Sequence, residues 1–479
     1  MSDILSSLRS SASALAVYQQ VLAVTQNNVA NASTPGYAKQ TLQLRALPFD
    51  LQWGALGGVR AGEVQSARDE HAEQAVRRQT VSLGLAQQNV SSLEALESLF
   101  DVTGSSGISK SLNNLFQSFS AWGQSPTDTN ARASVIQRAG ELADSFRQTA
   151  SGLANLRQET EQQLQQTVDQ VKGLTGQLRD LNRQIMAGAK NDSGVESQVN
   201  SLLEELSQYV DFTATRAGDG SVTVLVNGQT PLLIEDRTYD LGYRLEQTSD
   251  ATAPYPDAPP LAHIFAADGK DVTAQITGGQ LGALLHTRNQ VLPSYLGDAS
   301  HEGDLNTMAR QFADRVNELL EAGQVNTGDP PQMGVALFQY DTGNHTNAAN
   351  SLTVDTTVTP AQLGPIAAGP PLVFNGTPLA LSALAAPQTD ADRVGGASYS
   401  AYYGGMAARA GSALNDARDE LTTRQSTVAQ AKDLRQRMSG VSLDEEATVM
   451  IQFQRAYEAT SRLITILNQL TEDTINILR

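Results

Sequence analysis

The sequence predicts a mainly α-helical protein with β-rich insertions. In this fold the N- and C-terminal helices pair as a coiled-coil-like stalk, accompanied by a helical middle domain and one or more small outer β domains. Three observations support the prediction. Apolar residues recur at seven-residue spacing at both ends of the 479-residue chain, helical patterning dominates the interior, and two interior segments have the alternation of strands.

The first predicted helix ends in a motif rich in asparagine. Its apolar ladder, with a spacing typical of helices that pack on helices, consists of Leu8, Leu15, Leu22 and Val29. The stretch NNVANASTPGYAKQ follows, and its asparagines favour a helix end. Pro35 then prevents continuation and Gly36 permits a tight turn, before Tyr37 and an extended segment at 41–44.

The interior alternates between helical and strand-like segments. Residues 64–186 have mostly helical patterning with breaks at 103–108 and 123–130, and residues 131–186 predict one long helix. The segment from 210 alternates apolar and polar residues around GDG and NG, which is typical of hairpins.

The resulting domain prediction has seven segments. They are the inner helical assembly domain (1–60 and 439–479), the helical rod domain (61–208, 279–324 and 400–438), and the β-rich or irregular insertions (209–278 and 325–399).

The last predicted helix mirrors the first. Ser442 and Glu445 have capping-box spacing, and acidic residues follow where the helix dipole favours them. Two heptad series with flanking apolar residues form its stripe: Val449, Ala456, Leu463, Leu470 and Ile477; Phe453, Thr460, Leu467 and Thr474; Met450, Tyr457, Ile464 and Leu478.

Composition restricts the function. The net charge of −18 argues against general nucleic-acid binding and against docking on an anionic membrane. No cysteine is present, which excludes thiol catalysis, and no nucleotide-binding, hydrolase or zincin motif occurs. The five histidines lack ligand spacing, and the cluster at 301–304 is better explained as an exposed loop than as a metal site. We therefore expect no catalytic residues, metal or cofactor.

The two terminal stripes suggest assembly. Each stripe is wide enough to need more than one neighbour, so pairing the two helices leaves apolar surface for other subunits. The simpler alternative is that both helices pack only on the body of their own chain.

Both ends resemble the bacterial flagellar axial family, which includes rod, hook and hook-associated proteins. The resemblance lies in NNVANASTPGYAKQ and in GVSLDEEATVMIQFQRAYEATSRLITILNQL. The interior is similar to the family of flagellar hook-associated protein 1, also called the FlgK family, in LESLFDVTGSSGISKSLNNLFQSFSAWGQSPTDTNARASVIQRAGELADSF and ITGGQLGALLHTRNQVLP. The resemblance as a whole covers about residues 1–340 and 400–479, and it is weak through the β-rich segments.

This resemblance implies a structural protein of the hook–filament junction, outside the cell. It implies export through the flagellar type III channel without a cleaved signal, which agrees with the absence of a continuous apolar core near the N-terminus. The implied partners are further copies in a ring or helical assembly, the hook protein, hook-associated protein 3, and an export chaperone on the C-terminal helix. Neither nucleic acid nor membrane is an implied partner.

The expected assembly interface combines the two ends of the chain. Asn28 and Asn31 either bond neighbouring subunits or cap the first helix. The full expected set is Leu8, Leu15, Leu22, Asn28, Val29, Asn31, Pro35, Gly36, Tyr37, Val449, Phe453, Tyr457, Leu463, Ile464, Leu467, Leu470 and Ile477.

Two alternatives remain open. The first is a hook or rod subunit of the same family. The second is a stalked carbohydrate-binding or enzymatic surface protein, with its activity in residues 210–275 or 325–395.

Overall fold

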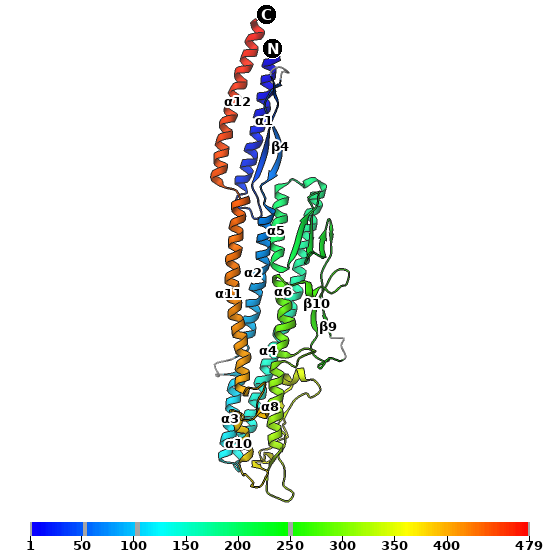
Figure 1. The fold of residues 1–479 in the computed structure, drawn as a ribbon, viewed down its shortest axis with the longest axis vertical. Helices are drawn as coiled ribbons and strands as arrows, with labels where there is room; N and C mark the ends of the chain where they lie inside the picture. Colours follow the sequence, from blue (N-terminus) through cyan, green and yellow to red (C-terminus); the bar gives the residue numbers. More distant parts are fainter. Residues whose placement is uncertain (1, 51–54, 101–105, 248–251, 478–479) are drawn as a thin grey trace. The chain divides into compact units, whose positions relative to one another are not determined.

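The structure, a computed structural model, describes residues 2–50, 55–100, 106–247 and 252–477 (Figure 1). The chain forms two compact units. The terminal unit contains residues Met1–Leu83, Val171–Asp240 and Arg424–Arg479, and the central unit contains Gly84–Gln170 and Leu241–Thr423. Three long helices contribute residues to both units: α2 (Glu70–Glu97), α4 (Thr129–Gln184) and α11 (Tyr399–Ser439).

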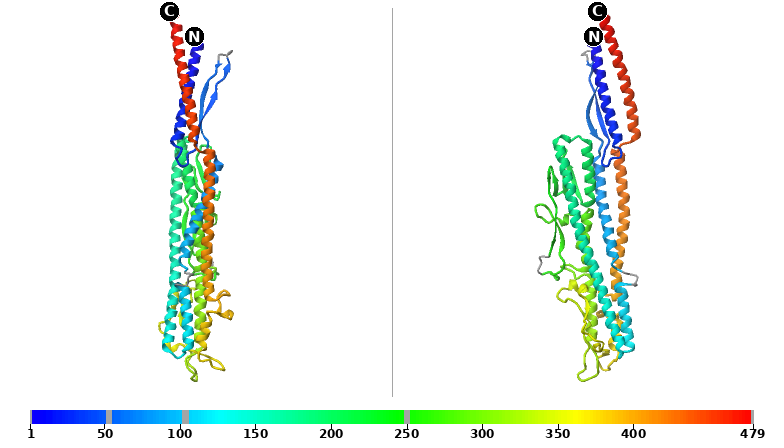
Figure 2. Two further views of the ribbon diagram at one scale, coloured as in Figure 1. Left: turned by 90° about the vertical axis from the view of Figure 1, so that its left-hand side faces the viewer. Right: turned by 180° about the vertical axis from the view of Figure 1, so that it is seen from behind.

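The terminal unit contains both chain ends. Helices α1 (Ser2–Ala30) and α12 (Leu443–Ile477) run antiparallel side by side, as Figures 1 and 2 show. A hairpin of β1 (Gln40–Ala46) and β4 (Val59–Ser66) packs on α1, where Ser10 and Ser13 donate hydrogen bonds to the backbone oxygens of Gly57 and Val59 at 3.3 and 3.2 Å. The short strands β2 (Phe49–Asp50) and β3 (Ala55–Leu56) also pair. The extended segment predicted at 41–44 is confirmed.

A small sheet completes this unit. Its antiparallel strands are β5 (Phe212–Arg216), β6 (Val222–Val226), β7 (Thr230–Ile234) and β8 (Arg237–Thr238). The turns fall at GDG and NG, which confirms the predicted hairpins. Asn182 near the end of α4 anchors the sheet, because its amide bonds the backbone N and O of Val222 at 2.9 and 2.8 Å. Helix α5 (Ser193–Tyr209) follows α4 and the π-helical turn η1 (Ile185–Ala189).

The central unit contains the main hydrophobic core. Helices α3 (Gly107–Gln124) and α8 (Asp304–Glu321) pack there with parts of α2, α4 and α11. Phe312 lies at its centre, with ring centroids 5.0 Å from Tyr399 and 5.8 Å from Phe338. Trp122 is also fully buried. The long helix predicted over 131–186 is confirmed, and the predicted interruption after residue 123 separates α3 from α4.

Short elements fill the rest of the central unit. They are β9 (Gly242–Glu246), β10 (Leu261–Phe265), η2 (Thr273–Gln275), α6 (Gly279–His286), η3 (Thr287–Val291), α7 (Leu292–Leu296), β11 (Gly323–Gln324), β12 (Phe338–Gln339), η4 (His345–Asn347), α9 (Ala348–Ser351), β13 (Thr353–Val354), η5 (Pro360–Gln362), β14 (Ile366–Ala367), α10 (Gly376–Ala383) and η6 (Asp390–Asp392).

The segment 325–399 is less strand-like than its sequence indicates. The pieces ALFQY and SLTVD do pair, through β12 and β13. Helix α10 was not predicted, because Pro378 and a small-residue composition obscure its pattern. Pro378 is tolerated in the first turn, and Leu381 is fully buried in the core. The first half of the break predicted at 103–108 lies outside the described residues, and α3 begins at Gly107 within the second half. Among the described helices, none is long and apolar enough to cross a membrane.

Candidate functional site: the paired chain ends

The pairing of α1 with α12 is the first component of the site. The Tyr18 and Phe453 rings lie 5.7 Å apart, and Gln19 Nε2 donates a hydrogen bond to Tyr457 Oη at 3.2 Å. The side chains of α12 that are half-buried share the face toward α1: Val449, Met450, Phe453, Ala456, Tyr457, Thr460, Ile464, Leu467, Thr471 and Thr474. On α1, the predicted Leu8, Leu15 and Leu22 are half-buried. The predicted terminal helix pair is therefore confirmed.

A second apolar strip on α12 is left uncovered. Leu463, Ile466 and Leu470 are 48%, 57% and 49% exposed, and their i, i+3, i+7 spacing puts them on one flank of the helix. We call these three residues the lateral stripe. Val29 on α1 is also exposed, at 38%, and the side chain of Ile477 lies outside the described residues. The wide apolar stripe predicted on α12 thus divides into a face covered by α1 and an exposed flank.

Asn28 joins three segments of the terminal unit at the base of α1. It is 1% exposed, and its side-chain amide pairs with the backbone of Gln40, accepting from N at 2.9 Å and donating to O at 2.8 Å. Asn28 Nδ2 also donates to the buried Glu446 carboxylate of α12 at 3.0 Å. The two predicted alternatives for Asn28 were bonds to neighbouring subunits and capping of the first helix. In the structure, its side-chain oxygen and nitrogen both bond to other segments of the same chain.

The turn after α1 is closed by its own side chains. Asn31 Nδ2 donates to Asn27 O at 3.0 Å, and Thr34 Oγ1 donates to Asn31 Oδ1 at 3.1 Å. Tyr37 Oη lies 2.9 Å from the side-chain oxygens of both Asn27 and Asn28. Pro35 is exposed at the tip of this turn.

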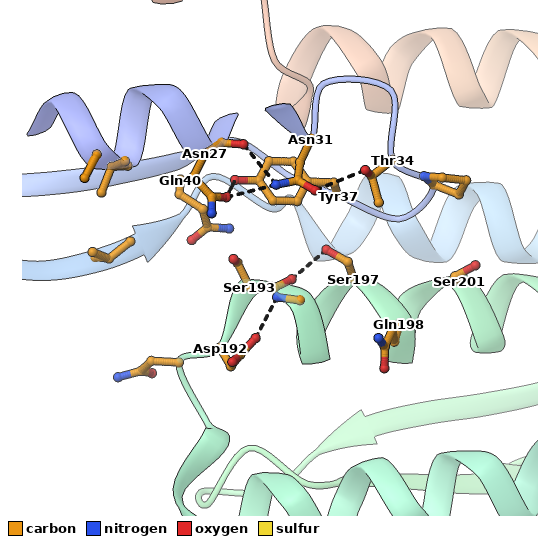
Figure 3. Close-up of a pocket in the computed structure, with 16 residues that line it drawn as sticks. Asn27, Asn31, Thr34, Tyr37, Gln40, Asp192, Ser193, Ser197, Gln198 and Ser201 are labelled. Carbon is orange, nitrogen blue, oxygen red and sulfur yellow. Dashed lines mark hydrogen bonds between the residues drawn. The ribbon is translucent and has the colours of Figure 1, made fainter. Parts of the chain in front are cut away.

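Gly36 allows the turn to pack on α5. Its φ of +73° lies in the left-handed region, and a Cβ there would be 2.5 Å from Ser197 O. Beside the turn is an open cleft of about 850 Å³, lined by residues of α1, the turn, β4 and α5 (Figure 3). Asn31 and Tyr37 lie on one side of it, and Ser197 lies on the other (Figure 3).

Lys39 connects the turn to α12. Its Nζ lies 2.9 Å from Glu445 Oε2 and 3.1 Å from Glu446 Oε1. The predicted cap on α12 is present in part, because Ser442 Oγ accepts from Glu445 N at 3.4 Å while the Glu445 carboxylate bonds Lys39. The Lys39 backbone N also donates to Ser439 O at 2.9 Å, where α11 ends at the predicted break.

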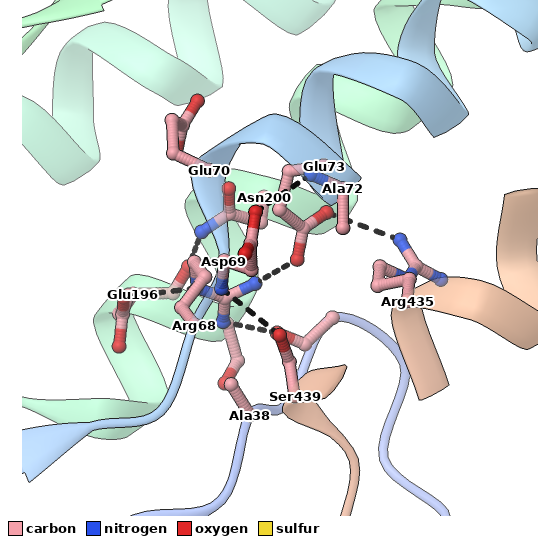
Figure 4. A network of polar contacts seen from close by, with 12 residues as sticks. Ala38, Arg68, Asp69, Glu70, Ala72, Glu73, Glu196, Asn200, Arg435 and Ser439 are labelled. Carbon is pink, nitrogen blue, oxygen red and sulfur yellow. Dashed lines mark hydrogen bonds and ion pairs between the residues drawn. The ribbon is translucent and has the colours of Figure 1, made fainter. Parts of the chain in front are cut away.

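A buried ionic network lies next to these contacts (Figure 4). The Arg68 guanidinium bonds Glu73, donates to Glu196 at 2.9 Å and donates to the Gly36 oxygen at 2.6 Å. Arg435 of α11 lies 3.2 Å from the same Glu73 and 2.6 Å from Glu204 of α5. We use the name polar corner for both sets of contacts together. Its members are Asn28, Gly36, Tyr37, Lys39, Gln40, Arg68, Glu73, Glu196, Glu204, Arg435, Ser439 and Glu446. The sequence did not predict the ion pairs that Arg68 and Arg435 form with these glutamates.

The electrostatics of the polar corner favour charged bases and a neutral tyrosine. Burial raises the pKa of Tyr37 to about 12, and the Glu446 and Glu196 carboxylates add to this. Burial lowers the pKa of Lys39, but hydrogen bonds to Glu445 and Glu446 outweigh it, so the net direction is upward. Burial likewise raises the pKa of Glu204, but Lys432 and Arg435 reverse the shift and lower it.

The cluster at 301–304 is not the exposed loop that was predicted, because Glu302 is only 8% exposed and its carboxylate pairs with an arginine. Glu302 accepts from Arg310 Nε and Nη2 at 2.6 and 3.0 Å, and Asp304 bonds Arg409. No group of three or more potential metal-binding side chains occurs among the residues that the structure describes.

Fold and site together define a helical structural protein whose chain ends pair and are fastened at a polar corner. Comparison with known proteins identifies the family. The model of the flagellar hook-associated protein FlgK helical domain matches residues 93–338. Models of the flagella basal body rod protein and of the flagellar basal body rod FlgEFG protein C-terminal region match residues 8–37 and 435–477. The chain belongs to the FlgK family of flagellar hook-associated proteins and is a structural component of the flagellum.

Individual relatives support the assignment to this family. The chain is 28% identical to flagellar hook-associated protein 1 of Bacillus subtilis (strain 168), covering 97% of this chain and 96% of the relative. It is 23% identical to the protein of that name from Escherichia coli (strain K12), covering 97% and 98%. The structure of the flagellar hook junction protein FlgK from Burkholderia pseudomallei matches with a TM-score of 0.61 and 15% identity over 76% of this chain and 99% of that one, a likeness of fold. The predicted family is confirmed.

Proposed function

We propose that this chain forms the junction between flagellar hook and filament by self-assembly through its terminal helices. Its partners are further copies of itself, the hook protein and a second junction protein, and it acts outside the cell without catalysis. An export chaperone covers the C-terminal helix before assembly. A hook or rod subunit is the second candidate, since rod-protein models match both chain ends; the FlgK match over residues 93–338 favours the junction.

The lateral stripe is the observation on which this proposal rests. Its three side chains are about half exposed in the isolated chain, although α1 already covers the adjacent face of α12. Covering them in an assembly contributes about 1 kcal/mol each. Repeated around an axis, such a contact builds a ring or tube.

The predicted interface residues then divide into two roles. Phe453, Tyr457, Ile464 and Leu467 hold α12 on α1, and Asn28, Gly36 and Tyr37 fix the polar corner. Contacts with other copies come from the predicted residues that remain exposed, Val29, Pro35, Leu463 and Leu470, together with Ile466, which was not predicted. This division explains how a subunit is shaped before it meets its neighbours.

The test replaces Leu463 and Leu470 by aspartate in cells that lack their own copy of this protein. We expect exported subunit but no stable filaments, because two charges would enter a contact that excludes water. The control is Phe374→Asp, at an apolar position of the central unit that is even more exposed (64%). Normal filaments in the double variant would overturn the proposal.

A further inference from the structure

Arg157 of α4 is a half-buried arginine in the central unit whose charge is not paired. It shares one face of α4 with Glu161, which follows it by four residues. The Glu161 carboxylate, however, accepts a hydrogen bond from Arg288 Nε at 2.8 Å. Among the residues that the structure describes, the Arg157 guanidinium has no hydrogen-bond acceptor and no carboxylate in ion-pair contact. It therefore loses part of its hydration without gaining a partner in return.

The surroundings of Arg157 carry an excess of positive charge. Arg288 is 1% exposed, and its Nη2 also donates to the Pro260 oxygen at 2.6 Å. Two guanidinium groups thus share the single carboxylate of Glu161. Burial lowers the pKa of Arg157, the nearby Arg288 charge lowers it further, and Glu161 opposes both effects. An anionic group placed against Arg157 would relieve this imbalance.

Arg157 lines an open cleft that can hold a small molecule. The cleft has a volume of about 420 Å³, and its lining comes from α4 and from segments at 257–260 and 344–350, all within the central unit. Ligand sites of this size combine an apolar lining with a few polar groups that fix the orientation of the ligand. The apolar part of this lining consists of Ala150, Ala154, Ala258, Pro259, Pro260 and Leu296.

Side-chain amides around the cleft keep groups that can still form hydrogen bonds. Gln247 Nε2 donates to two backbone oxygens at 2.8 and 2.6 Å, which leaves its Oε1 as an acceptor. Asn350 Nδ2 donates to Asn347 Oδ1 at 3.1 Å, which leaves Asn347 Nδ2 as a donor. Asp257 is exposed and adds further acceptors, and no ion pair joins it to Arg157 in the described part of the chain. This mixture of donors and acceptors matches hydroxyl groups, which act as both.

We propose that this cleft binds a small hydroxylated carboxylate, of which a hexuronic acid is an example. The carboxylate lies on Arg157, whose planar guanidinium can donate two parallel hydrogen bonds to it. The hydroxyl groups lie on the side-chain amides and on Asp257. Because every lining residue belongs to the central unit of one chain, this site does not depend on the assembly proposed above.

Titration of the full-length monomer with D-glucuronate tests the proposal. We expect saturable binding by isothermal titration calorimetry, and at least about tenfold weaker binding of D-glucose, which lacks the carboxylate. Arg157→Met keeps the apolar stem and should weaken glucuronate binding by at least about tenfold, whereas Arg157→Lys should retain part of it. The matched control is Arg138→Met on the same helix. Arg138 pairs with Glu141 and does not line the cleft, so binding should be unchanged.

Thermal unfolding separates a binding role of Arg157 from a structural one. Arg157→Met should leave the melting temperature unchanged or raise it, because no described group loses a bond. Arg288→Met should lower it, because Glu161 loses its buried partner. Glucuronate should raise the melting temperature of the wild type but not that of Arg157→Met.

Three results would overturn the site. They are the absence of saturable glucuronate binding, binding that is unchanged in Arg157→Met, and equal binding of glucose and glucuronate. A fall in melting temperature for Arg157→Met as large as that for Arg288→Met would show that Arg157 is structural, which also contradicts the proposal. None of these results bears on assembly through the terminal helices, so the two proposals fail separately.

Discussion

The central and terminal units differ in how completely they bury their apolar residues. In the central unit, Phe312 is fully buried among the rings of Phe116, Phe338 and Tyr399. In the terminal unit, α1 and α12 share the half-buried Tyr18–Phe453 contact, and α12 keeps an exposed apolar flank. The central unit is thus stabilised within the chain, whereas the terminal helix pair leaves apolar surface uncovered, which in the function proposed above other copies would bury.

The largest expected effect is in the central core. Phe312→Ala should lower the free energy of unfolding of that unit by about 3–5 kcal/mol, since it leaves a cavity between three aromatic rings. Urea unfolding followed by Trp122 fluorescence, in a Trp53→Phe background, measures it. The matched control is Phe453→Ala in α12, expected to cost about 1 kcal/mol in the monomer because that ring is only half-buried. Equal losses at the two sites would remove the contrast between the units.

The polar corner should be the most sensitive part of the terminal unit. Arg68→Ala should cost about 3 kcal/mol, because Glu73 and Glu196 lose a buried positive partner. Circular dichroism during urea unfolding would report the loss. As a control, Arg138→Ala breaks an exposed pair with Glu141 and should change stability by less than about 0.5 kcal/mol. A tolerated Arg68→Ala would show that the network does not hold the unit together.

Asn28→Ala should have a smaller effect, about 2 kcal/mol. It leaves the Gln40 backbone and the buried Glu446 carboxylate without their amide partner. Asn31→Ala is the comparison, since Asn31 is more exposed and bonds only within the turn. Similar thermal shifts for the two variants would contradict the assignment of Asn28 as the joining residue.

The alkaline titration of Tyr37 should give the smallest change. An unfolded tyrosine loses its proton near pH 10, and the folded pKa is raised to about 12. The stabilisation linked to this proton is therefore complete below about pH 10 and is lost as the pH rises toward 12. Ultraviolet absorbance of tyrosinate, as a difference between wild type and Tyr37→Phe, should show a component near pH 12. A component near pH 10 would mean that Tyr37 is not buried in the corner.

The sequence was most informative where the pattern is local. Seven-residue spacing predicted α1 and α12, and the Pro35–Gly36 pair predicted the turn between α1 and β1. Local patterns could not predict that Arg68, Glu73 and Arg435 meet, because these residues belong to different elements and each also suits a solvated helix or loop. Nor could heptads show which flank of α12 faces α1; Leu463 continues the same series as Val449 but is exposed. Helix α10 could not be predicted either, because it is stabilised by burial of Leu381 in the core, which depends on the tertiary structure.

Amide hydrogen exchange on the verified monomer tests the central claim most directly. We expect fast exchange in the distal parts of α1 and α12 and strong protection in α3, α8 and the core-facing part of α4. In assembled flagella, the terminal helices should become protected as well. Protection of α1 and α12 in the monomer equal to that of the central core would show that the two helices form a stable pair without other copies. That result would contradict assembly through their exposed flank.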